Sequence, residues 1–121
     1  MRIPRTAMSP GLRRGLALAV LLAWALHSWA MAQEYSLAIM CWSCHVATLA
    51  VAAGLWRGHA LLAAAGSLFH LSVGLPSWLV ETLVSGRWFP TSVLIHVFPP
   101  AAGLLYLRRA GELPRGAVPV A

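Results

Sequence analysis

Long apolar stretches alternate with short groups of charged residues along this chain. A helix that crosses a ~30 Å hydrocarbon core needs about 20 apolar residues, and each of the four stretches reaches that length. Inside lipid every backbone polar group must bond within the protein, so these stretches favour helices over isolated strands. The pattern predicts an all-α integral membrane protein whose four spans lie at about 15–33, 36–56, 60–80 and 89–107.

Composition narrows the class of protein further. Of the 121 residues, 60% are hydrophobic and 10% are charged, whereas an average soluble domain carries roughly 25% charged residues. Such a chain cannot cover an ordinary soluble surface, and it is too apolar for a disordered segment. We therefore expect a single transmembrane domain over 1–121, with a disordered Gly/Pro-rich tail at 111–121.

The arginines predict how the spans are oriented. Arginines gather at the N-terminus, at Arg57 between the second and third stretches, and after the fourth stretch, whereas Arg87 alone shares the other side with Glu34 and Glu81. The positive-inside rule then places both termini in the cytoplasm. Short connections, including an outer one at 81–88, predict an up-down four-helix bundle, N-in/C-in, in a bacterial inner membrane. The arginines at the helix ends are expected to meet lipid headgroups, not nucleic acid.

The N-terminus also permits a second interpretation. A basic start, an apolar run and Ala30-Met31-Ala32 together match a secretory signal peptide with its cleavage site. Cleavage after Ala32 would leave three spans in the same orientation. We expect the first helix to be retained, because the second span begins within a few residues of the site.

Histidines supply the candidate chemistry. Ionisable residues within spans are costly and often functional. Each predicted span carries one histidine, and at ~1.5 Å per residue all four fall in the outer half of the bilayer. Bundles build metal and cofactor sites from inward-facing side chains, and imidazole is a common ligand of metals and haem. The candidate ligands are His27, His45, His70 and His96.

Two cysteines enter the same layer at the start of the second span. Cys41 and His45 are four residues apart and share a helix face, and Cys44 lies beside them. Cys44 is thus a further candidate metal ligand. The stretch Cys41–His45 also matches C-x-x-C-H, the attachment motif of c-type haem. Alternatively, the two thiols are close enough for a disulfide, and a helix N-terminus favours the reactive thiolate.

This thiol arrangement resembles the quinone-linked membrane disulfide oxidoreductases. Those are four-span proteins with a C-x-x-C at the outer start of the second span, where Cys41 and Cys44 fall. The resemblance implies a thiol–disulfide oxidoreductase with these two catalytic cysteines. The chain departs from the family because its outer loop at 81–88 has no second cysteine pair. The arginine that contacts quinone shortly after the motif is also missing around Thr48.

A wider set of short motifs resembles small uncharacterised bacterial four-span integral membrane proteins. The motifs are 44–47, the turn at Arg57, 75–78 and 96–100. These proteins are distantly similar to a family that contains a Cys/His lipid acyltransferase. The resemblance implies Cys44 as a nucleophile and His96 as its base.

The residues themselves favour an outer-leaflet His/Cys site that binds haem or a transition metal. We expect an electron-transfer, metal-handling or accessory-subunit role, with His45 and His96 as the leading ligands. Other membrane subunits or a second copy of the chain could complete the site. A structural subunit without a cofactor is the alternative, and the sequence does not decide whether the protein is an enzyme.

Overall fold

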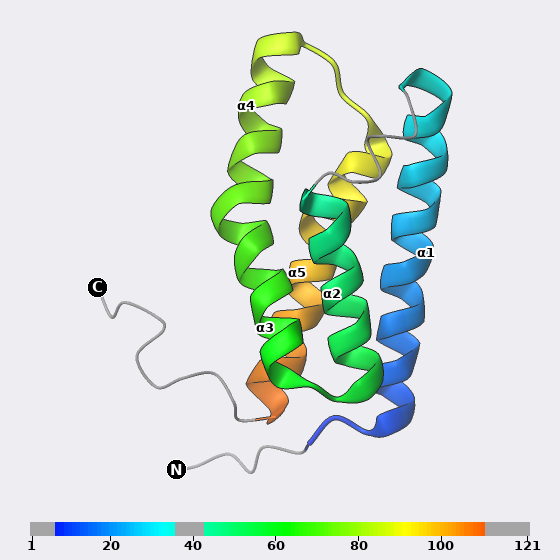
Figure 1. Ribbon diagram of the computed structural model, residues 1–121, viewed down its shortest axis with the longest axis vertical. Helices are drawn as coiled ribbons and strands as arrows, with labels where there is room; N and C mark the ends of the chain where they lie inside the picture. Colours follow the sequence, from blue (N-terminus) through cyan, green and yellow to red (C-terminus); the bar gives the residue numbers. More distant parts are fainter. Residues whose placement is uncertain (1–6, 36–42, 111–121) are drawn as a thin grey trace, which may run out of the picture.

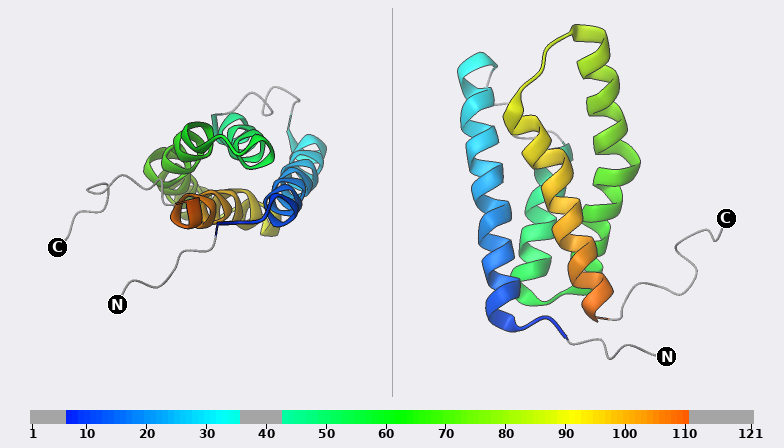
Figure 2. Two further views of the ribbon diagram at one scale, coloured as in Figure 1. Left: turned by 90° about the horizontal axis from the view of Figure 1, so that it is seen from below. Right: turned by 180° about the vertical axis from the view of Figure 1, so that it is seen from behind.

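The computed structural model describes residues 7–35 and 43–110, and every regular element within these ranges is a helix. The prediction of an all-α fold is confirmed for this part of the chain. The elements are α1 (Pro10–Glu34), α2 (Ser43–Arg57), α3 (Ala60–Phe69), the π-helical turn η2 (His70–Gly74), α4 (Leu75–Ser85) and α5 (Pro90–Ala110). Because α3, η2 and α4 follow one another without a break, they form one rod beside the other three helices (Figures 1 and 2). Cys41 and the predicted tail at 111–121 lie outside the described residues.

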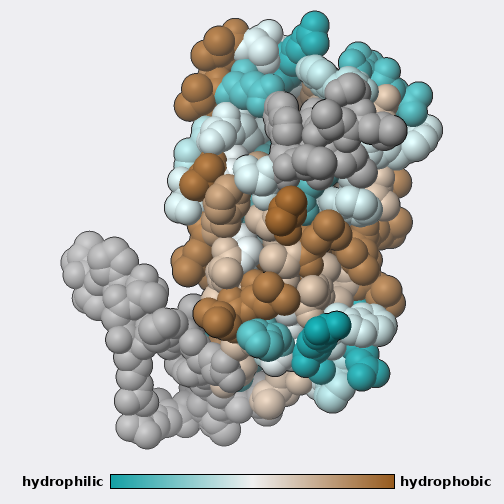
Figure 3. Space-filling model, viewed as in Figure 1, coloured by the Kyte–Doolittle hydropathy of each residue, from teal (hydrophilic) through white to brown (hydrophobic). Residues whose placement is uncertain are grey.

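Three of these rods are long and apolar enough to cross a membrane. They are Pro10–Glu34, Ala60–Ser85 and Pro90–Ala110. The described part of α2 has 15 residues, and the rest of the predicted second span falls in the undescribed segment 36–42. Large apolar side chains such as Leu22, Leu61 and Leu83 are exposed on the outside of the bundle. Figure 3 shows a largely apolar middle with hydrophilic residues toward both ends, which is the surface of a membrane protein.

Local signals explain where α1 begins and where α4 ends. The hydroxyl of Ser9 accepts a hydrogen bond from the Leu12 amide (3.2 Å), and Pro10 follows at the first helical position, so α1 begins there. At the other end of the bundle, α4 stops at Gly86, whose φ of 66° suits a glycine. The predicted outer loop at 81–88 is therefore too long. Glu81 lies on the last turns of α4, because the helix ends at the glycine and not at the first charge.

A tight apolar core fills the half of the bundle that contains the turn between α2 and α3. Gly54 and Gly66 let α2 and α3 approach closely, because a Cβ on Gly66 would stand 2.6 Å from the carbonyl oxygen of Ala47. The core brings together side chains from four helices: Ala17, Val20, Val51, Ala52, Leu55, Ala63, Ala102, Tyr106 and Leu107. Dispersion and close packing between these helices stabilise this half of the protein.

The π-helical turn η2 interrupts the rod of α3 and α4 at the level of the predicted histidine layer. Proline lacks an amide hydrogen and crowds the carbonyl four residues before it, so Pro76 disfavours a regular α-helical turn at Ser72. The Leu75 amide instead bonds to the carbonyl of His70, five residues back. Such π-turns are frequent at functional sites. Here the wider turn includes His70, which is fully buried.

An arginine ties α1 to the C-terminal end of α2. The guanidinium of Arg13 donates hydrogen bonds to the carbonyls of Leu55 and Trp56, the latter at 2.7 Å. Both carbonyls belong to the last turn of α2, where a cation also complements the helix dipole. The neighbouring Arg14 lies over the ring of Trp56, with its guanidinium carbon 5.5 Å from the ring centroid. These contacts hold the first turn of α1 against the last turn of α2.

Candidate functional site

The structure brings all four histidines of the predicted spans together. His27 comes from α1, His45 from α2, His70 from η2 and His96 from α5, and each side chain is at most 8% exposed. The rings of His27 and His45 stack with centroids 5.4 Å apart. His96 meets His27 and His70 edge to face at 6.5 and 6.2 Å. Helix rotation, which the sequence left open, directs all four rings toward one region.

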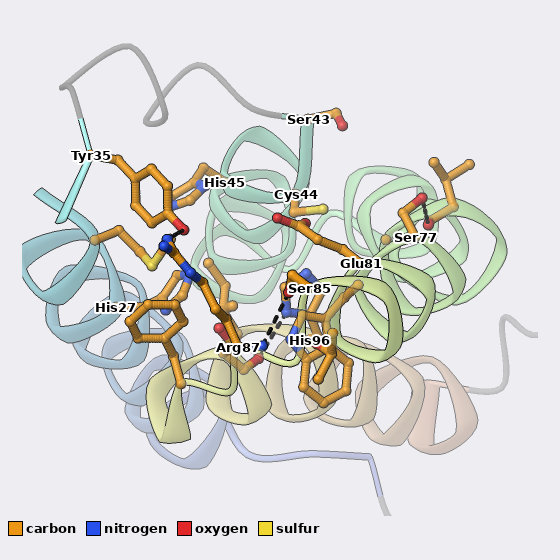
Figure 4. A pocket seen from close by; sticks show the side chains of 18 residues that line it. His27, Tyr35, Ser43, Cys44, His45, Ser77, Glu81, Ser85, Arg87 and His96 are labelled. Carbon is orange, nitrogen blue, oxygen red and sulfur yellow. Dashed lines mark hydrogen bonds between the residues drawn. The ribbon is translucent and has the colours of Figure 1, made fainter.

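A cavity of about 320 Å³ opens beside this cluster (Figure 4). Its walls include His27, His45 and His96 together with the half-buried Cys44. His70 does not belong to the walls and stands behind Gly74, which does. The volume falls in the range of small-molecule and cofactor sites.

His96 is held in one tautomer by its own helix. Its Nδ1 lies 2.8 Å from the carbonyl oxygen of Ser92. A carbonyl only accepts, so Nδ1 carries the hydrogen and Nε2 keeps the lone pair of the neutral ring. The indole of Trp78 stacks on the same imidazole, with centroids 5.2 Å apart and planes inclined by 13°. A histidine that donates one ring nitrogen to a carbonyl is prepared to bind a metal through the other.

His70 is held in the opposite tautomer by Thr48. The Thr48 hydroxyl donates to the carbonyl of Cys44 at 2.8 Å. The hydroxyl has only one hydrogen. It must therefore accept a hydrogen bond from Nε2 of His70, which lies 2.9 Å away. The hydrogen of the neutral imidazole therefore sits on Nε2, and the lone pair sits on Nδ1. That Nδ1 is buried and has no hydrogen-bond partner among the described residues.

His45 lacks partners for both ring nitrogens within residues 7–35 and 43–110. Its side chain is 2% exposed, and each buried polar group without a partner costs about 1–3 kcal/mol. His27, by contrast, bonds to the Thr91 hydroxyl through Nδ1 at 3.0 Å. Native proteins carry few such unpaired groups, and those that persist often serve binding or catalysis.

Further polar side chains line the cavity, and the sequence interpretation assigned none of Tyr35, Glu81 and Arg87 to a site. Glu81 and Arg87, which the sequence analysis used only to orient the spans, both line the cavity. Arg87 donates a hydrogen bond to the phenol of Tyr35 (3.3 Å), and this contact raises the pKa of the Arg87 guanidinium. Glu81 follows Gly74 by seven residues on one rod, a spacing that returns to the same helix face and could have signalled its position.

The described residues do not already form a metal centre. Among them, no group of three or more His, Cys, Asp or Glu side chains is arranged to hold a metal ion. The predicted Cys41–Cys44 pair cannot be placed, because Cys41 lies outside the described part. What the structure provides is a set of close imidazoles, two with defined tautomers and one without partners, beside a cavity.

Comparison of the chain with protein-family profiles, with curated proteins and with solved structures gives no significant match. The resemblances to disulfide oxidoreductases and to small bacterial membrane proteins therefore stay expectations from short motifs.

Proposed function

We propose that this chain is a metal-binding protein of the bacterial inner membrane, with four spans and both termini in the cytoplasm. The cavity would hold a transition-metal ion through His45 and His96, with His27 as a third ligand. The observation that carries the proposal is the convergence of these three imidazoles, from three helices, on one cavity. The bound ion would serve electron transfer, metal handling or an accessory role in a membrane complex.

The ring separations support an ion as the occupant. A metal–nitrogen bond of ~2.0–2.1 Å puts the centres of two ligating imidazoles about 5–6 Å apart. The separation of His27 and His45, 5.4 Å, falls in this range, whereas His27 and His96, at 6.5 Å, stand somewhat farther apart. Rotation of the rings about their side-chain bonds would be needed to aim the lone pairs at one point. Binding would also give His45 the partner that it lacks.

The same geometry favours an ion over haem. A porphyrin that uses two axial imidazoles must stand between them, and the stacked rings of His27 and His45 leave no such gap at 5.4 Å.

Elemental analysis of the full chain, purified in detergent and after mild reloading with Zn²⁺, Ni²⁺ or Cu²⁺, tests the proposal. We expect one ion per chain, and at least 10-fold weaker binding in His45→Ala and in His96→Ala. His59→Ala is the matched control, because His59 caps α3 far from the cluster. Absorption spectra of oxidised and reduced protein examine haem in the same samples. A folded, monodisperse protein that takes up no ion, or one that carries a Soret band, would overturn the proposal.

A further inference from the structure

A corner of the cavity, formed by Cys44, His70 and Gly74, is chemically distinct from the three-imidazole wall. We infer that Cys44 Sγ and His70 Nδ1 form a two-ligand site for a soft monovalent cation of the copper(I) class. This site uses none of His27, His45 and His96. It therefore stands or falls separately from the function proposed above.

The orientation of His70 leaves one of its ring nitrogens without a hydrogen-bond partner among the described residues. Thr48 accepts from Nε2 of His70 and donates to the carbonyl of Cys44, so it fixes the imidazole against the start of α2. The nitrogen left with a lone pair is Nδ1, which is buried and unpartnered among the described residues. A fully buried imidazole with an unused lone pair is available to bind an ion.

The space beside this nitrogen is bordered by Gly74. A Cβ on this residue would stand 3.2 Å from His70 Nδ1 and 3.3 Å from Cys44 Sγ. The two candidate ligand atoms therefore border the same small space, and only the absence of a side chain at Gly74 keeps it open. The π-turn η2, which runs from His70 to Gly74, places both residues at this point.

Charge and coordination number identify the class of ion. Thiolate and imidazole are soft or borderline ligands that suit copper(I), whereas hard cations require oxygen ligands. One thiolate neutralises a monovalent ion, but a divalent ion here would leave a net charge buried within the bundle. Copper(I) accepts two ligands in a line. Bond lengths like those of zinc, ~2.0 Å to nitrogen and ~2.3 Å to sulfur, would place the two ligand atoms about 4.3 Å apart. The absence of a three-ligand group among the described side chains is no obstacle to such a site.

The binding step is balanced without any change of oxidation state. The Cys44 S–H bond breaks and its proton leaves to solvent as the S–metal bond forms, while Nδ1 of His70 gives its lone pair to the ion. Throughout, the neutral imidazole of His70 keeps its hydrogen on Nε2 and donates it to the hydroxyl of Thr48.

Silver(I), a redox-inert monovalent probe, tests the site in the full-length protein in detergent. Calorimetric titration and native mass spectrometry report the affinity and the stoichiometry. We expect one tight Ag⁺ per chain, and about 100-fold or greater weakening in Cys44→Ser and His70→Gln, since loss of a direct ligand should equal or exceed the effect of an outer partner. Gly74→Ala retains both ligands and should weaken binding comparably by filling the space between them.

Two matched controls sharpen the outcome. Ser72→Ala changes an exposed side chain of the same π-turn and should bind Ag⁺ like the original chain. Cys41→Ser should also bind normally. Equal loss in Cys41→Ser and Cys44→Ser would overturn the inference in favour of a two-thiol site. Tight binding that survives in Gly74→Ala and His70→Gln would overturn it in favour of the thiol alone. The His45→Ala and His96→Ala variants, which test the proposed function, should keep their Ag⁺.

Discussion

The hydroxyl of Thr48 accepts a hydrogen bond from Nε2 of His70 across the interface between α2 and the π-turn η2. Both side chains are fully buried. The same hydroxyl is bound to the backbone of its own helix at Cys44. One threonine therefore connects the start of α2 to the histidine and decides which ring nitrogen is available.

Thr48→Val tests this connection. Valine keeps the shape of threonine but leaves the Nε2–H of His70 without an acceptor, so we expect a loss of about 1–3 kcal/mol of stability. Thermal unfolding in detergent measures the change. Thr48→Ser keeps the hydroxyl and should recover most of the loss. Equal stability of the threonine and valine forms would contradict the hydrogen bond.

His45→Leu should stabilise the metal-free protein while it abolishes binding in the cavity. The imidazole of His45 is buried with two unpartnered nitrogens within the described part of the chain, and an apolar side chain of similar size removes that cost, about 1 kcal/mol or more. Unfolding with a chelator present measures the metal-free state. If His45→Leu instead lowers the stability of the metal-free protein, an ordered partner such as water already bonds to His45.

Gly66→Ala should destabilise the bundle severely. Its Cβ would meet the backbone oxygen of Ala47 at 2.6 Å, and backbone cannot yield as a side chain tip can. Overpacking of this kind costs about 1–3 kcal/mol or more. Gly15→Ala is the matched control, because nothing lies within 4 Å of a Cβ there. That change should be neutral or stabilise α1 by about 0.5–1 kcal/mol. The prediction fails if the two variants unfold at the same temperature.

Arg13→Ala should loosen α1 from the C-terminal end of α2. It removes the donors to the carbonyls of Leu55 and Trp56, and we expect a loss of about 1–2 kcal/mol. Arg14→Ala removes only the cation–π contact with Trp56 and should cost less, about 0.5–1 kcal/mol. Thermal unfolding of the two variants gives the comparison. A larger loss of stability in Arg14→Ala than in Arg13→Ala would contradict the prediction that the Arg13 hydrogen bonds dominate this contact.

Sequence reasoning went furthest where periodicity and depth alone decide the outcome. Uncharged stretches predicted helices, and one histidine per span at a common depth predicted that His27, His45, His70 and His96 would share a layer. Depth follows from counting residues along a helix. The rotation of each helix depends on packing between helices, and the sequence pattern did not determine it.

The remaining details depend on contacts between distant residues. The tautomer of His70 follows from Thr48, a partner that no local spacing connects to it. The helix end at Gly86, and with it the position of Glu81, was missed because charges were taken as helix boundaries. A glycine is the stronger stop signal, because it adopts the left-handed conformation that ends a helix.

The apolar core limits how far the cavity reaches along the bundle. Val20, Val51 and Leu55 are completely buried in that core, and none of the core residues lines the cavity. A molecule in the cavity would therefore lie in one half of the bundle. A water-filled path along the whole bundle would first require the packed helices of the other half to separate.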